Sequence, residues 1–92
     1  MSSVQPKVEV VNGIPLEFEP AGLIRDRVTT VALTGSGTAN IYAVHQDNDP
    51  ILIVSGGTVP MMPQNIYGVG YTKIIVEQLT GSVFASITSA RY

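Results

Sequence analysis

The clearest alternation of hydrophobic and polar positions lies close to the C-terminus. Val83, Ala85 and Ile87 fall at every second position, so they share one face of an extended strand. The preceding run, Tyr71–Leu79, is rich in β-branched residues and is separated from the final run by Thr80-Gly81. Two β-prone runs around a glycine-containing turn predict a β-hairpin here.

A second hairpin is predicted in the middle of the chain. Residues 27–33 and 38–44 are β-prone runs joined by Thr34-Gly35-Ser36-Gly37. The Gly-x-Gly spacing is not a phosphate-binding loop, because a dinucleotide fingerprint needs a third glycine and a following helix. Here a strand-like run follows, so we interpret the glycines as a connection between strands.

The next segments carry apolar residues without clear alternation. Ile51–Ser55 is a continuous apolar run, typical of a strand that is buried on both faces or lies at a subunit contact. The glycines in Gly56-Gly57-Thr58 predict a turn or bulge. Two prolines then flank Met61 and Met62. These methionines either cap the core of the domain or form an intersubunit patch.

The first 26 residues differ from the rest of the chain, since they hold three of its six prolines. Proline is confined to edges, turns and extended arms. Lys7–Val11 and Ile14–Phe18 are short extended pieces joined by Asn12-Gly13, a strong hairpin signal. Two interpretations are open: a peripheral hairpin on this domain, or an extended arm that pairs with a neighbouring subunit.

These patterns predict one all-β domain. About seven or eight short strands, with turns every eight to twelve residues or so, are typical of β-sandwiches and barrels. We expect a small antiparallel β-sandwich or barrel with jelly-roll or Greek-key-like connections and an extended, proline-containing N-terminal arm. The arm or peripheral hairpin is assigned to residues 1–26 and the sandwich domain to residues 27–92.

Composition favours protein–protein contact over other partners. Charged residues make up 13% of the 92 residues, about half of the usual ~25%. Charge depletion marks the cores of protein interfaces, so we expect a homo-oligomer or attachment to a larger shell. A net charge of −2 with five Lys and Arg residues argues against nucleic acid. We expect no membrane span, and no signal peptide at the N-terminus.

The residues needed for catalysis or metal binding are sparse. Cysteine is absent and His45 is the only histidine, so we expect neither a nucleophile–base pair nor a thiolate metal site. Glu9 and Glu17 stand across the predicted N-terminal turn, and nothing in the sequence makes them converge. His45–Pro50 is interpreted as a polar turn rather than a cation site, because it lacks the glycine and glutamate spacing of a calcium loop. We predict no enzyme activity and no catalytic, cofactor or metal-binding residues.

Part of the chain resembles a known class of proteins. The pattern VTTVALTGSGTANIYAV, a polar turn, PILIVSGG and a closing TGSVFASITSARY is similar to that of small β-sandwich structural proteins of tailed-bacteriophage virions. The resemblance covers residues 27–55 and the final strand. It implies a capsid decoration (cement) or head–tail joining protein, made in the host cytoplasm and located in the virion. Such a protein would be a homo-oligomer in contact with capsid or other virion proteins.

The resemblance also suggests which residues make the contacts. The N-terminal arm would lie along a neighbour through small apolar anchors. The candidate interface residues of the arm and the methionine segment are Val8, Val10, Leu16, Met61 and Met62.

The alternative function is a small β-sandwich module that binds carbohydrate or a receptor. Carbohydrate sites favour exposed aromatic platforms, although tyrosines on strands also serve as core or interface residues. The aromatic residues that would form such a platform are Tyr42, Tyr67, Tyr71 and Tyr92.

Overall fold

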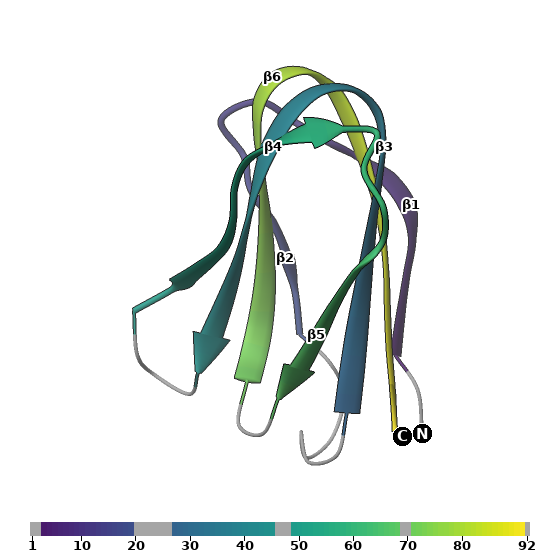
Figure 1. The fold of residues 1–92 in the computed structure, drawn as a ribbon, viewed down its shortest axis with the longest axis vertical. Coiled ribbons are helices and arrows are strands. Elements are labelled where there is room, and N and C mark those ends of the chain that lie inside the picture. Colours follow the sequence, from purple (N-terminus) through teal and green to yellow (C-terminus); the bar gives the residue numbers. More distant parts are fainter. Residues whose placement is uncertain (1–2, 20–26, 46–48, 69–70, 92) are drawn as a thin grey trace.

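The computed structural model describes residues 3–19, 27–45, 49–68 and 71–91, which form a single β-sheet (Figure 1). Its six strands are β1 (Ser3–Val10), β2 (Leu16–Phe18), β3 (Arg27–His45), β4 (Ile51–Val59), β5 (Gln64–Gly68) and β6 (Tyr71–Arg91). Every pairing between them is antiparallel. The predicted all-β antiparallel class is therefore confirmed.

The two longest strands, β3 and β6, form the centre of the sheet. They pair along their whole length, from Arg27 opposite Arg91 to His45 opposite Tyr71. The sequence predicted a separate hairpin in each of these segments, and that prediction is wrong. Each strand continues through its glycines, and Figure 1 shows the two strands curving over the top of the molecule together.

Three glycines make this common bend sterically feasible. Gly35, Gly37 and Gly81 have positive φ values of 106°, 129° and 77°. Gly37 stands opposite Gly81, and a Cβ atom on Gly37 would overlap the carbonyl oxygen of Thr80. A Cβ on Gly81 would likewise overlap the carbonyl oxygen of Ser36. Because glycine has no Cβ, the two backbones can approach closely enough to bend as a pair.

The bend divides the sheet into two layers. The first layer contains, in order, β2, the first half of β6, the second half of β3, and β4. The second contains β1, the second half of β6, the first half of β3, and β5. Except for the connection between β3 and β4, each connection crosses from one layer to the other. This is a jelly-roll arrangement, as the sequence predicted.

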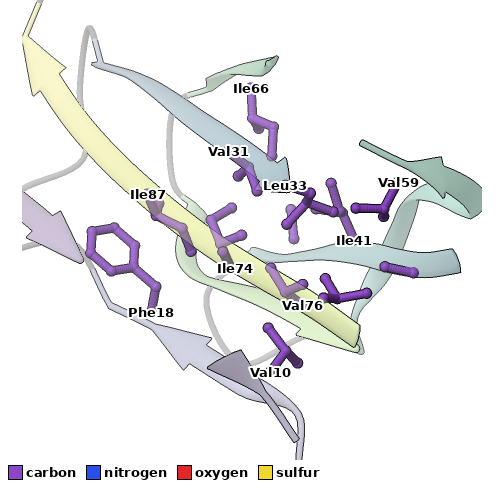
Figure 2. Close-up of a cluster of buried hydrophobic side chains, with 14 residues drawn as sticks. Val10, Phe18, Val31, Leu33, Ile41, Val59, Ile66, Ile74, Val76 and Ile87 are labelled. Atoms are coloured by element: carbon purple, nitrogen blue, oxygen red, sulfur yellow. The ribbon is translucent and has the colours of Figure 1, made fainter. Parts of the chain in front are cut away.

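The hydrophobic core lies between the two layers. Along β6, Val83, Ala85 and Ile87 are fully buried, which confirms the face predicted from their alternation. Figure 2 shows side chains from both layers directed toward one another. The complete set of buried apolar residues is Val10, Phe18, Val31, Leu33, Ala39, Ile41, Ala43, Val59, Ile66, Ile74, Val76, Val83, Ala85 and Ile87.

The N-terminal segment belongs to this sandwich. β1 and β2 pair with opposite halves of β6, so the Asn12-Gly13 turn joins two layers instead of closing a hairpin. Val10 and Phe18 are both buried in the core (Figure 2). Neither open interpretation describes this arrangement, because the segment is neither a hairpin of its own nor an arm paired outside the chain. Its two described strands, β1 and β2, each lie at one edge of a layer, where proline is tolerated.

Candidate functional surface: the two flanks of the sandwich

The strand order of the sheet gives the sandwich two dissimilar flanks. β1 and β2 lie beyond β6 in their respective layers, whereas β4 and β5 lie beyond β3. We call residues 3–18 the β1/β2 flank and residues 51–68 the β4/β5 flank. Edge strands expose unpaired backbone groups and are therefore the places where a sheet can recruit another chain.

The β1/β2 flank carries charged side chains. Lys73 Nζ, on β6 beside β2, donates a hydrogen bond of 2.7 Å to Glu17 Oε1 and lies 3.8 Å from Glu19 Oε1. The hydrogen bond to Glu17 and the charge of that carboxylate raise the pKa of Lys73 above its usual 10.5. On β1, the Lys7 ammonium lies 5.2 Å from the centre of the Phe84 ring. Charges of this kind discourage pairing with another strand.

The β4/β5 flank has the opposite character. The sequence contains no charged residue from Pro50 to Thr72, a range that includes both edge strands. Ile51, Leu52 and Ile53 at the start of β4 are nevertheless 49%, 48% and 40% exposed. The sequence allowed this run to be buried on both faces or to lie at a subunit contact. Burial on both faces is wrong, because these three side chains are each at least 40% exposed, on a strand that lies at the edge of its layer.

The β4 strand also contains the predicted glycine bulge. Its register against β3 shifts between Ala39 and Ile41, opposite the segment that contains Gly56. The Gly56 N–H, displaced from the regular ladder, donates a hydrogen bond of 2.7 Å to Asn40 Oδ1. A side chain of β3 therefore satisfies a backbone donor that the bulge would otherwise leave unpaired.

The five predicted interface residues lie in different environments. Val10 is 1% exposed in the core, so its prediction as an interface residue is wrong. Leu16 and Met61 are partly buried against the same core. Val8 and Met62 are exposed, but the structure places them on different flanks. The run Ile51–Ser55 was predicted either to be buried on both faces or to lie at a subunit contact, but it was not included among the five candidate interface residues.

The tyrosines considered for a carbohydrate platform are not brought together in the described structure. Tyr42 and Tyr67 project outward from the first and second layers respectively, as their alternation with buried neighbours requires. The Tyr42 hydroxyl donates to Glu77 Oε1 at 3.0 Å and accepts from Asn40 Nδ2 at 3.1 Å. The polar end of this ring is thus held by its own sheet. The side chain of Tyr71, and Tyr92, lie outside the described residues.

The two glutamates considered for paired acid–base chemistry, Glu9 and Glu17, are also separated by the fold. Glu9 is paired with Phe84 in the second layer, and Glu17 with Ile75 in the first. Both lie between inward-facing neighbours, so they project from opposite faces of the sandwich. Within the described part of the chain, no group of three His, Cys, Asp or Glu residues could hold a metal ion. Residues 46–48 of the predicted polar turn lie outside the described residues.

Comparisons of this chain with protein-family models, with curated proteins and with solved structures gave no match. In the described ranges, no helix is long and apolar enough to cross a membrane.

Proposed function

We propose that this protein is a non-enzymatic structural component of a virion, of the capsid decoration (cement) or head–tail joining kind. It acts through homo-oligomeric contacts and through contacts with capsid or other virion proteins. The observation that carries the proposal is the β4/β5 flank, which is free of charged residues and exposes Ile51, Leu52 and Ile53 at the edge of a layer. Such a surface is suited to protein–protein contact.

The sequence resemblance and the fold support the same class of function. The residues of the phage-like pattern, 27–55 and the final strand, include β3, the first five residues of β4, and the second half of β6. A jelly roll with a core shared between its layers provides a rigid scaffold for surface contacts. On a repeating shell, many weak contacts add by avidity, so each copy needs only modest affinity.

The alternative, a carbohydrate-binding module, has less support. Its two described tyrosines lie on opposite faces, and Tyr42 is already hydrogen-bonded to Glu77.

The test is the copy number of the chain in virus particles. Particles would be purified by density gradient from a culture in which the chain is expressed from its natural genome. Quantitative mass spectrometry would then compare the chain with the major shell protein. We expect at least several copies of the chain per particle, and we expect them to remain bound after a high-salt wash. Absence from washed particles would refute the virion assignment, and a cytoplasmic protein of known copy number serves as the contamination control.

A further inference from the structure

The edge of β4 has an open hydrogen-bonding side. Within the described residues, β4 pairs with β3 and with no other strand. In an antiparallel strand, alternate residues turn their N–H and C=O groups to opposite sides, so one set faces away from β3. At the start of β4, Ile51, Leu52 and Ile53 place large apolar side chains around these groups.

Two of the other edge strands, β1 and β2, carry features that discourage pairing, and the third, β5, is uncharged but only five residues long. β1 contains Pro6, Lys7 and Glu9, while β2 is three residues long and contains Glu17. β4 has neither a charged residue nor a proline over its nine residues. Its protection consists of the glycine bulge and a second register shift, which leaves Ile53 as an extra residue between Leu52 and Val54. The segment open to a partner is therefore short, residues 51–55, and contains this second irregularity.

A second copy of this chain is the partner that such a surface fits best. In an isologous contact the same patch meets itself, so a charge at the two-fold axis would face its own like charge, and a charge elsewhere on the patch would need an opposite charge at the position that it meets. An uncharged, apolar strand meets itself without that repulsion. A charged partner would lose hydration at its ionic groups here and gain no ion pair in return.

We infer that β4 pairs antiparallel with β4 of a second copy about a two-fold axis, joining the first layers of two molecules into one continuous sheet. This inference rests on the proposed function, for which it specifies the homo-oligomeric contact. The paired segment is short, so it buries little area compared with the ~800 Å² per partner of a typical interface. Association is therefore weak in dilute solution and becomes strong where copies are arrayed on a shell.

The first experiment places a lysine on the β4 edge. Leu52→Lys is compared with Val4→Lys on the opposite flank. Both sites are exposed, at 48% and 61%, and both lie on an outward-facing strand position. Sedimentation equilibrium from low micromolar to millimolar concentration measures self-association, and circular dichroism checks folding. We expect Leu52→Lys to weaken association at least tenfold and Val4→Lys to change it less than twofold. Equal effects would refute the inference.

The second experiment detects the contact itself and does not depend on a substitution that weakens self-association. The chain has no cysteine, so single cysteines can be placed at each position from Ile51 to Ser55, with Val4→Cys as the control. In a symmetric antiparallel pair one residue faces its own copy, with Cα atoms about 4.5–5.5 Å apart, a separation that suits a disulfide. Its sequence neighbours lie too far from their own copies. We therefore expect one position to form a disulfide dimer much faster than the positions beside it.

The outcomes separate this inference from the proposed function. Uniform or absent cross-linking along β4, with wild-type self-association retained, would overturn β4 pairing and leave the homo-oligomeric proposal standing. Position-specific cross-linking in a chain that is missing from washed particles would support β4 pairing and overturn the virion assignment. A wild-type chain that stays monomeric at millimolar concentration and forms no disulfide dimer would overturn the pairing.

Discussion

The placement of Val10 can be tested by a single substitution, because the core and arm interpretations of this residue predict different results. Val10 is 1% exposed and pairs with the buried Val83. Val10→Ala removes two methyl-sized groups, worth about 1.6 kcal/mol at ~0.8 kcal/mol each. The cavity left behind raises the expected loss of unfolding free energy to about 2–3 kcal/mol.

That loss is large for a domain of this size. At ~0.05–0.15 kcal/mol per residue, 92 residues give a total stability of about 5–14 kcal/mol. The midpoint of thermal unfolding should fall by about 10 °C or more. Val8→Ala is the matched control, since Val8 lies on the same strand, faces the buried Ala85 and is 36% exposed. Its substitution should cost less than about 1 kcal/mol.

The assay is urea unfolding followed by circular dichroism at two protein concentrations that differ tenfold. If Val10 lies in the core of its own chain, its destabilisation is the same at both concentrations. An arm paired with a neighbouring subunit would instead give a stability that depends on protein concentration. An unchanged unfolding free energy for Val10→Ala, or a loss seen only at one concentration, would refute the placement of β1 in this sandwich.

Two further predictions concern the bend and the charged flank. Gly37→Ala should destabilise the fold by at least about 2 kcal/mol in the same urea assay, because its Cβ would collide with the backbone of Thr80 at a φ of 129°. Gly56 has a φ of 59° and open space around it, so Gly56→Ala should reduce the unfolding free energy less. If Gly37→Ala were the less destabilising of the two, the steric account of the bend would be contradicted. Lys73 has a raised pKa because it donates to Glu17, so its contribution to stability is present below pH 10.5 and is lost as pH rises through the raised value. The unfolding free energy of Lys73→Gln should therefore fall less than that of the wild type between pH 9 and 11.5. Identical pH profiles of the two proteins would contradict the stabilising role of the Lys73–Glu17 pair.

Local sequence predicted the strands well because alternation follows directly from burial on one face. Val83, Ala85 and Ile87 are an example: their spacing alone placed them in the core. The two central hairpins were wrong for a physical reason. Glycine at positive φ suits both a tight turn and a bend in a continuous strand. Which one forms depends on the strand opposite, and the alignment of Gly37 with Gly81 is a contact between segments far apart in the sequence.

The N-terminal segment shows the same limit. Asn12-Gly13 does form a turn, with the Ile14 N–H donating to the Val11 carbonyl at 3.0 Å. The local pattern could not specify that the strands on either side would pair with different halves of β6. Burial of Val10 and Phe18 favours that outcome, because an isolated two-stranded hairpin has no core in which to bury them.

The candidate surface depends on both sequence and topology. The stretch without charges, residues 50–72, can be recognised directly in the sequence. Its meaning appears only when β3 and β6 are seen to occupy the centre of both layers, because this leaves β4 and β5 together on one side. Composition thus indicated protein–protein contact, while the fold determined which residues are available for it.

The asymmetry between the flanks also limits what β4 pairing can build. Pairing across a two-fold axis uses the open edge of both copies, so the contact closes on itself. At each outer end of the joined sheet lies β2, a strand of three residues next to the Glu17–Lys73 ion pair. A short, charged edge is a poor template for another strand. Edge pairing within the first layer therefore stops at two copies, and assembly into a shell would require contacts outside the β4 edge.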